Sequence, residues 1–217
     1  MEKKGVSFSE MQRRAWEREY ARKGPLWCGP ALFDFKIPGS MHVLELGCGN
    51  GKTLEALVKT GAKVTAIDFS PKAVALCKGL AREKGWNDIE LLIADACDLP
   101  FPDSSFDAVV AFHLLEHLLE GDRQKAVSEI KRVLRKGGTV FVQAFSTDDM
   151  RFGKGEELEE NTFVRGTGMI SHYFTEEEMK VLFSGFSEKF MERTSKEKHY
   201  HGKEFKRDRI IAVYERC

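Results

Sequence analysis

The sequence predicts a doubly wound α/β fold, in which a mostly parallel sheet carries helices on both faces. A short apolar run at 43–46 leads into glycines at alternate positions and then into a helical stretch. Strand-like and helix-like segments then alternate with short connections, which is typical of a parallel sheet. The run at 106–112 is continuously apolar, as expected for a strand buried on both faces.

The glycine-rich segment is the most informative part of the chain. Residues 43 to 53 read Val-Leu-Glu-Leu-Gly-Cys-Gly-Asn-Gly-Lys-Thr, and a helix is expected over 53–59. Glycine is needed where the backbone takes a positive φ or must approach a ligand without a Cβ in the way. The first N–H groups of the helix supply donors at the same place. The turn therefore predicts a nucleotide-binding loop, with candidate contacts at Glu45, Gly47, Cys48, Gly49 and Gly51.

The spacing of these glycines argues against a nicotinamide dinucleotide. A dinucleotide fingerprint is G-x-G-x-x-G, and Lys52 stands where its third glycine is required. The phosphate-loop pattern G-x-x-x-x-G-K-[ST] does not occur in the chain. An NAD-dependent dehydrogenase is therefore the less favoured enzyme class.

The remaining elements of the core follow in order. Further strands are expected at 63–67, 89–93, 106–112 and 139–145. One helix begins after the N-cap Ser70, has Pro71 in its first position and ends near Gly85. Another begins around Asp122 as N-cap and ends at Gly137-Gly138.

The last third of the chain is less regular. The stretch from 146 to 171 holds four glycines and an acidic run without a clear period, so we expect a functional or disordered loop. Thr175 and Glu178 form a capping box for a helix that ends at about Phe183. Segments 186–193 and 207–214 are expected to form a terminal strand pair.

The length of 217 residues predicts one domain with a substantial core. We expect an N-terminal lid segment at 1–36, a cofactor-binding core at 37–146, an acceptor-side loop at 146–171, and a C-terminal helix and strand pair at 172–217.

Composition limits the possible partners and the cell compartment. Lysine plus arginine equals aspartate plus glutamate at 34 each, so no global charge indicates nucleic acid or an anionic membrane. Basic residues gather near both ends, but acidic residues interrupt them, as on a solvated face. The five cysteines are widely spread without metal-ligand spacing, and no signal peptide or membrane span is visible. These features predict a cytoplasmic protein with reduced thiols and no membrane partner.

Candidate ligand contacts follow the predicted strands, at the sheet edge where open α/β sheets bind ligands. Asp68 could accept both hydroxyls of a ribose, and Phe69 could pack on an adenine or cover the core. Asp95 and the N–H of Ala96 suit an adenine amino group and ring nitrogen. Glu45 could meet a ligand ammonium group. The floor of the crevice is expected to come from Phe112, His113 and His117.

Five segments resemble successive motifs of class I S-adenosylmethionine-dependent methyltransferases of the small-molecule, type 11-like kind. They are Val43 to Thr53, Ala66-Ile-Asp-Phe-Ser70, Ala94-Asp-Ala-Cys-Asp-Leu-Pro-Phe101, Phe106-Asp-Ala-Val-Val-Ala-Phe-His-Leu-Leu-Glu-His117 and Arg132-Val-Leu-Arg-Lys-Gly-Gly138. The resemblance implies a Rossmann-like, seven-stranded sheet whose last strand is antiparallel. It implies S-adenosyl-L-methionine as cofactor and S-adenosyl-L-homocysteine as product. The implied cofactor contacts are Glu45, Gly47, Asp68, Asp95 and Ala96, with His113 near the methionine end.

One motif suggests a different chemistry. His113-Leu-Leu-Glu-His117 matches H-x-x-E-H, an inverted zinc-protease pattern. No compelling third ligand is visible, and the segment follows a buried strand within the methyltransferase-like series. We therefore predict no metal site.

The acceptor is harder to infer than the cofactor. No [DNS]-P-P-[YF] motif follows the fourth strand and no Pro-Cys nucleophile occurs, so methylation of base N6 or C5 atoms is disfavoured. We expect a small-molecule acceptor, consider nucleic acid unlikely, and leave the oligomeric state open. The alternatives are a protein methyltransferase and a non-catalytic S-adenosylmethionine-binding regulator.

Aromatic and histidine side chains are the candidates for the acceptor side. Trp16, Tyr20 and Trp27 suggest an amphipathic lid that either encloses the ligand or staples onto the sheet. Segments 171–174 and 199–201 could supply imidazole or phenol groups. His172 and Tyr20 are the candidate catalytic residues, as groups that orient or deprotonate an acceptor.

Overall fold

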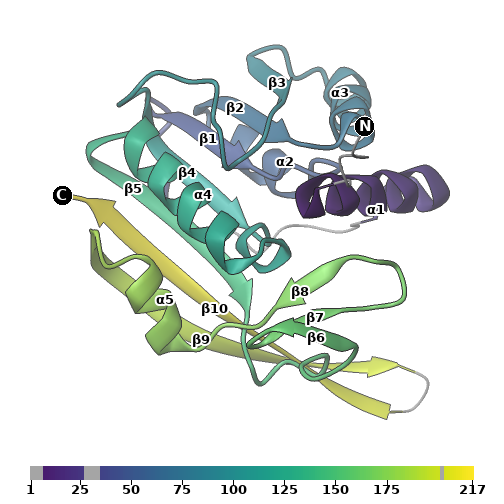
Figure 1. Cartoon of the computed structure of the whole chain (residues 1–217). Helices are drawn as coiled ribbons and strands as arrows, with labels where there is room; N and C mark the ends of the chain where they lie inside the picture. Colours follow the sequence, from purple (N-terminus) through teal and green to yellow (C-terminus); the bar gives the residue numbers. More distant parts are fainter. Residues whose placement is uncertain (1–6, 27–34, 201–202) are drawn as a thin grey trace, which may run out of the picture.

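The structure is a computed structural model that describes residues 7–26, 35–200 and 203–217, with side chains described at 7–26, 35–197 and 206–217. Figure 1 shows the arrangement of its elements. In chain order they are α1 (Phe8–Lys23), β1 (His42–Leu46), α2 (Lys52–Val58), β2 (Lys63–Asp68), α3 (Pro71–Lys84), β3 (Ile89–Ile93), β4 (Phe106–Phe112), the 3₁₀ turn η1 (Leu115–His117), α4 (Glu120–Val133), β5 (Leu134–Phe145), β6 (Glu156–Glu159), β7 (Thr162–Val164), β8 (Ile170–His172), α5 (Glu176–Leu182), β9 (Phe186–Tyr200) and β10 (Lys203–Arg216).

The main sheet has seven strands in the order β3-β2-β1-β4-β5-β10-β9. Strands β1 to β5 pair in parallel, and β10 runs antiparallel to both β5 and β9. The order reverses between β1 and β4, which makes this the switch point of the sheet. The predicted fold class, a mostly parallel doubly wound sheet with an antiparallel last strand in the chain, is confirmed.

Helices cover both faces of this sheet (Figure 1). Two apolar cores fill the space between the layers. One core joins α4 and α5 to the sheet through side chains such as Ile130 and Phe183. The other joins α2 and α3 to the opposite face through Leu57 and Cys77. The inner strands β1, β2 and β4 are therefore buried on both sides, and β4 is accordingly a continuous apolar run apart from Asp107.

Local capping chemistry sets several helix ends where the sequence predicts them. The side chain of Ser70 accepts the N–H of Ala73 at the start of α3, and Gly85 ends the helix with φ 70°. Thr175 caps α5 in the same way through the N–H of Glu178.

Helix α4 departs from its prediction at both ends. It begins at Glu120 rather than near Asp122, because the carboxylate of Glu159 on β6 accepts the Glu120 N–H at 2.9 Å and acts as a cap from a distant segment. It ends at Val133, before the two glycines, because Leu134 already pairs with Phe106 of β4 as the first residue of β5.

The expected loop at 146–171 contains regular structure. Strands β6, β7 and β8 form a separate antiparallel sheet beside the carboxyl ends of the main strands (Figure 1). The terminal hairpin is also longer than predicted, since β9 and β10 pair from Phe186 and Arg216 to Tyr200 and Lys203. Strands of three or four residues, such as β6 to β8, carry too little sequence for a period to be visible.

In the part of the chain that the structure describes, no helix combines the length and apolar character required to cross a lipid bilayer.

Candidate functional site

A cavity of about 730 Å³ opens at the carboxyl ends of the parallel strands, where the switch point of the sheet predicts a ligand site. One end is lined by the glycine turn, the end of β2 and the residues after β3. The other end is lined by the residues after β5 and by the β9-β10 hairpin, and α1 forms a side of the cavity along most of its length.

The glycine turn has the backbone geometry of a ligand cradle. Gly47, Gly49 and Gly51 have φ values of 74°, 55° and 88°, in the region that side chains other than glycine rarely adopt. The N–H groups of Gly47 and Cys48 both donate to the carbonyl of Ile67, which anchors the turn to the end of β2. Gly47, Cys48 and Gly49 line the cavity. Gly51 lies against α3 instead, where an added Cβ would stand 2.8 Å from Leu80 Cδ2.

Asp68 connects β2 to the glycine turn. Its Oδ2 accepts the Gly49 N–H at 2.9 Å, and its Oδ1 accepts the Ser70 N–H at 2.9 Å. Each carboxylate oxygen can accept a further hydrogen bond, so Asp68 could also accept hydrogen bonds from the two hydroxyl groups of a ribose. Burial raises the pKa of Asp68 to about 6, although the two backbone donors oppose this shift.

Glu45 lies beneath the turn rather than on the cavity wall. Burial, followed by the nearby carboxylate of Asp68, raises the pKa of Glu45 to about 8. Its Oε2 is a buried acceptor without a hydrogen-bond partner. An unpaired buried oxygen is costly, and a cationic group entering the cavity nearby would lower that cost.

The residues after β3 and β4 complete the cofactor end. Phe69, Asp95, Ala96, Phe112 and His113, which are all candidate cofactor contacts, line the cavity. The Oδ1 atom of Asp95 accepts the Cys97 N–H at 2.8 Å, which fixes the turn and the orientation of the carboxylate.

The two histidines after β4 face different partners. His113 has φ 57°, and its Nδ1 lies 2.6 Å from Oε1 of the buried Glu116. His117 also lines the cavity, and its Nδ1 lies 2.7 Å from the carbonyl of Ile170 on β8. Among the described residues, no group of histidine, cysteine or carboxylate side chains has a metal-binding arrangement.

Helix α1 is tied to the molecule on both sides of the cavity. Oε1 of Glu17 accepts the Ser70 hydroxyl at 2.6 Å and the Lys72 N–H at 3.0 Å, at the start of α3. On the other side, Gln12 donates to the carbonyl of Gly168 at 2.9 Å and accepts the Ile170 N–H at 3.1 Å. The helix therefore bridges α3 and the small sheet.

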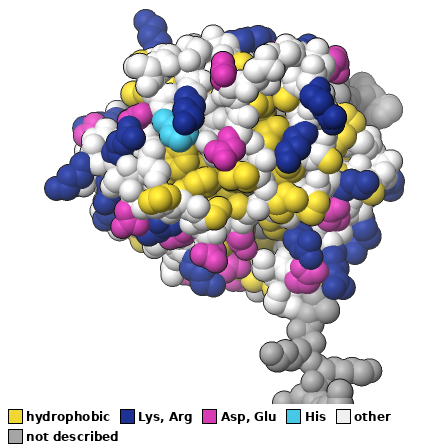
Figure 2. All heavy atoms as spheres, turned by 90° about the horizontal axis from the view of Figure 1, so that it is seen from above, with side chains coloured by type: hydrophobic (Ala, Val, Ile, Leu, Met, Phe, Trp, Pro, Cys, Tyr) yellow, Lys and Arg dark blue, Asp and Glu magenta, His cyan; other side chains and the backbone are white. Residues whose placement is uncertain are grey.

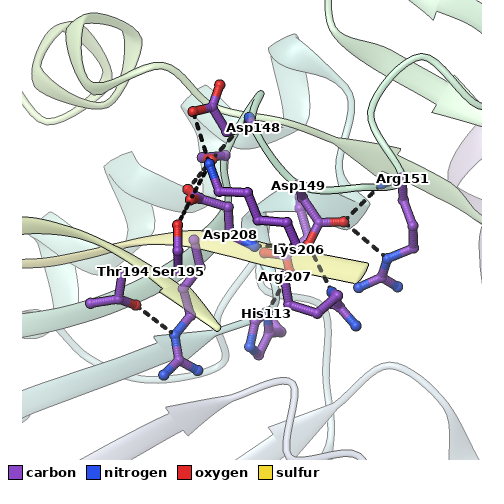
Figure 3. Close-up of polar contacts among 12 residues, drawn as sticks. His113, Asp148, Asp149, Arg151, Thr194, Ser195, Lys206, Arg207 and Asp208 are labelled. Atoms are coloured by element: carbon purple, nitrogen blue, oxygen red, sulfur yellow. Dashed lines mark hydrogen bonds and ion pairs between the residues drawn. The ribbon is translucent and has the colours of Figure 1, made fainter. Parts of the chain in front are cut away.

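An arginine-aromatic cluster forms the far end of the cavity, and Figure 3 shows its polar contacts around Asp149. The guanidinium carbons of Arg151 and Arg207 lie 4.4 and 5.1 Å from the ring centre of Phe145. The buried Asp149 receives a hydrogen bond from each arginine, at 3.2 Å from Arg151 Nε and 2.8 Å from Arg207 Nε. The ring of His113 lies 5.0 Å from that of Phe145, so the cluster adjoins the cofactor end.

Sequence reasoning missed this cluster. Arg207 and Asp149 are separated by 58 positions, and no spacing rule brings them together. The only sequence signal was the expectation that 146–171 lies on the acceptor side.

The two candidate catalytic residues have different positions. Tyr20 is buried on α1 and lines the cavity, beside Trp16. His172 is buried on β8 but does not line the cavity. Its Nδ1 lies 2.8 Å from the Thr162 hydroxyl and its Nε2 lies 2.7 Å from Oε1 of Glu178, which indicates a structural position between the small sheet and α5. The side chains of the 199–201 segment and Trp27 lie outside the described residues.

The residues present fit a sulfonium nucleoside. The cradle would not tolerate a Cβ at Gly47 without displacing Leu114, Asp68 keeps acceptor capacity for a ribose, and Glu45 offers an unpaired buried oxygen. Strand order, switch point and cradle together define the class I S-adenosylmethionine-dependent methyltransferase fold, and the chain belongs to that class.

Comparison with known proteins agrees with this assignment. Residues 44–142 match the family described as a methyltransferase domain. A crystal structure of a SAM-dependent methyltransferase from Methanosarcina mazei superposes with a TM-score of 0.70, at 26% identity, over 83% of this chain and 94% of that one. The tRNA N(3)-cytidine methyltransferase METTL2 of Danio rerio is 35% identical over 163 residues, which is 69% of this chain and 46% of that protein. The tRNA N(3)-cytidine methyltransferase METTL2B of Homo sapiens is 32% identical over 163 residues, covering 69% of this chain and 43% of that protein.

These relatives correct one expectation. A small-molecule acceptor, with nucleic acid unlikely, was expected from the neutral composition and the missing base-methylation motifs. That expectation is wrong, since the curated relatives are named for methylation of a tRNA base. The [DNS]-P-P-[YF] motif and the Pro-Cys nucleophile are typical of methylation at base N6 and C5 atoms, and their absence says nothing about methylation at N3. The chain spans less than half the length of these curated relatives.

Proposed function

We propose that the chain transfers a methyl group from S-adenosylmethionine to a base of RNA, with N3 of a tRNA cytidine as the first acceptor to test. The observation that carries the proposal is the 35% identity to a tRNA N(3)-cytidine methyltransferase over 69% of this chain. The cofactor, when bound, supplies a methyl group that is already activated by the positive charge on sulfur.

The arrangement of charge along the cavity supports an RNA acceptor. Acidic Asp68 and Asp95 lie at the cofactor end, whereas Arg151, Arg207 and Arg209 lie at the opposite end. Phosphate groups are attracted to the second end, and RNA-binding proteins commonly recognise bases that are splayed out of single-stranded regions. Phe145 and the arginines above it provide flat surfaces next to His113.

N3 of cytosine carries a lone pair and no proton in the neutral base, so this reaction requires no general base. The contribution of the chain is therefore to position the base and to exclude water. We propose that α1, including Tyr20 and Trp16, closes over the cavity as the lid, and that segment 146–171 borders the acceptor.

The face of the molecule seen in Figure 2 does not suggest a general polyanion-binding surface. On the side seen in Figure 2, hydrophobic side chains gather near the centre, and lysine, arginine and acidic side chains are mixed around them. RNA contact is therefore expected to be local, at the mouth of the cavity.

The test is to incubate the protein with methyl-labelled S-adenosylmethionine and unmodified tRNA transcripts, then digest the RNA and identify the labelled nucleoside by mass spectrometry. We expect label in N3-methylcytidine. Label in another nucleoside would retain RNA as acceptor and replace the base, whereas no label in any RNA would reject the proposal. An Asp68→Ala variant, impaired at the cofactor end, is the negative control.

A further inference from the structure

The β9-β10 hairpin continues beyond the main sheet at the end where the cavity opens. Strand β10 pairs with β5 only as far as Arg209, opposite Phe145, while its pairing with β9 continues from there to Lys203. The outer part of the hairpin, described at 194–200 and 203–208, therefore presents two faces beyond the end of β5. The face that includes Arg207 and Arg209 borders the cavity.

Strand register assigns the charged residues to these faces. Arg209 pairs with Thr194, and Arg207 pairs with Lys196, so these four side chains share one face. All four line the cavity. We call this the cavity face. The intervening residues, among them Arg193, Ser195, Lys206 and Asp208, belong to the opposite face.

The cations of the opposite face are neutralised within the protein. Arg193 lies 2.7 Å from a carboxylate oxygen of Asp148, and Lys206 lies 3.3 Å from Asp148 and 3.2 Å from Asp208. Asp208 also accepts the hydroxyl groups of Ser146 and Ser195. Figure 3 shows this network around Lys206 and Asp208.

Of the three cations on the described part of the cavity face, Arg209 and Lys196 are not neutralised in this way. Arg209 donates to the Thr194 hydroxyl at 3.2 Å and to Oε1 of Gln143 at 3.3 Å, which are both neutral groups. Within the described residues, neither Arg209 nor Lys196 forms an ion pair with a carboxylate. Burial lowers the pKa of the Arg209 guanidinium, with no opposing contribution from an acidic group.

Arg207 and Arg151 share one carboxylate, Asp149, and the Nη2 atom of Arg151 is buried without a partner. Arg151, Arg207, Arg209 and Lys196 therefore have one carboxylate as ion-pair partner among them, that of Asp149. Half-buried charges in proteins are normally paired, and this excess lies where an acceptor must enter.

We propose that Lys196 and Arg209, supported by Arg207, form a phosphate subsite that holds the RNA backbone while the acceptor base occupies the cavity. The guanidinium group presents several planar donors suited to phosphate oxygens, and the exposed lysine adds a second positive charge. The proposal rests on the proposed function, because it takes the anion to be a phosphate of the acceptor RNA. Beyond the proposed function, the subsite assigns phosphate binding to the cavity face of the β9-β10 hairpin.

The test compares Lys196→Gln with Lys206→Gln, which removes the same charge from the opposite face. The probe is a fluorescently labelled single-stranded RNA oligonucleotide, and its affinity is measured by anisotropy over a series of salt concentrations. We expect Lys196→Gln to weaken binding by about tenfold near 0.1 M salt and to lower the slope of log affinity against log salt by about one. Lys206→Gln is expected to change the affinity by less than about twofold. Equal losses in both variants, or an unchanged slope in Lys196→Gln, would reject the subsite.

Arg209 is tested separately, because its half-buried side chain also supports the sheet. Arg209→Gln is expected to weaken RNA binding, and Arg209→Lys to restore part of the affinity. Calorimetric titration with S-adenosylhomocysteine reports whether the cofactor end remains intact, and we expect its affinity to be unchanged in all of these variants. Parallel loss of cofactor and RNA binding in both Arg209 variants would mean that Arg209 is structural.

Two outcomes separate the inference from the proposed function. If the wild-type protein methylates RNA and Lys196→Gln binds and methylates RNA normally, the subsite is rejected and the function stands. If the wild-type protein methylates no RNA but binds the oligonucleotide through Lys196 and Arg209, the anion site stands and the function is rejected. If the oligonucleotide does not bind, both are rejected.

Discussion

The carboxylate of Asp68 accepts the backbone N–H of Gly49 at 2.9 Å. This bond joins the end of β2 to the middle of the glycine turn that follows β1. The side chain that we propose as a ribose contact therefore also supports the glycine turn, and its replacement is expected to affect both.

Asp68→Ala is expected to weaken S-adenosylhomocysteine binding by about 1–3 kcal/mol, because the proposed ribose contact and the support of the turn are lost together. Calorimetric titration measures the affinity. The control is Asp88→Ala, an exposed aspartate in the turn before β3. An affinity in Asp68→Ala equal to that of the wild type would remove Asp68 from the cofactor site.

The raised pKa of the Glu45 carboxyl group predicts an unusual dependence of protein stability on pH. The folded chain retains the Glu45 proton up to a pKa of about 8, whereas the unfolded chain releases it near the ordinary value of 4.5. The folded state binds more protons between these values, so this contribution to stability is complete below about pH 4.5 and is lost as the pH rises toward 8.

Glu45→Gln should remove this loss. Relative to the wild type, the variant is expected to gain at most about 1.4 kcal/mol of unfolding free energy per pH unit across this interval. Denaturant titrations at several pH values measure the difference, with Glu83→Gln on the exposed side of α3 as control. A difference that does not change with pH would show that Glu45 is ionised in the folded state.

Alanine substitutions at Gly51 and Gly79 are expected to have opposite effects on stability. Gly51 has φ 88°, and an added Cβ would stand 2.8 Å from Leu80 and 3.2 Å from Cys77, so Gly51→Ala is expected to cost about 1–2 kcal/mol or more. Gly79, inside α3, has no atom within 4 Å of an added Cβ. Gly79→Ala should stabilise the protein by about 0.5–1 kcal/mol through helix propensity. Thermal unfolding distinguishes the two, and equal effects would contradict the proposed role of the Gly51 backbone.

Gln12 connects α1 to the small sheet through two hydrogen bonds. Gln12→Ala is expected to accelerate hydrogen exchange at the Ile170 N–H and along α1, by about fivefold for each kcal/mol of lost hydrogen-bond free energy. Met11→Ala, on an exposed position of the same helix, is the control. Unchanged exchange in Gln12→Ala would mean that Glu17 and the aromatic contacts suffice to hold the helix.

Replacement of His172 tests whether this residue has a structural or a catalytic role. Because it is buried between Thr162 and Glu178, outside the cavity lining, His172→Ala is expected to lower stability by about 1–3 kcal/mol. This corresponds to roughly 2–4 °C in Tm for each kcal/mol in a chain of this size. The methylation rate per folded molecule should be retained at low temperature. A large fall in kcat with an unchanged Tm would instead support His172 as a catalytic residue.

The sequence alone determined the cofactor half of the protein. The strand, glycine turn and helix at 43–59, and the strand that ends at Asp68, are encoded by local periodicity, positive-φ glycines and capping residues. These signals act over a few positions, and parallel strands bring their carboxyl ends to one edge without further information. For this reason the sequence correctly predicts that Asp68, Asp95 and His113 lie at one cavity.

Only the tertiary structure decided the acceptor half. The cap that Glu159 provides for α4, the placement of Asp149 between Arg151 and Arg207, and the position of His172 outside the cavity depend on pairings across many residues. The register of β9 against β10 decides that Lys196 shares the cavity face with Arg209, while Lys206 lies on the other. A shift of one residue would exchange these faces, and no local pattern in the sequence specifies that register.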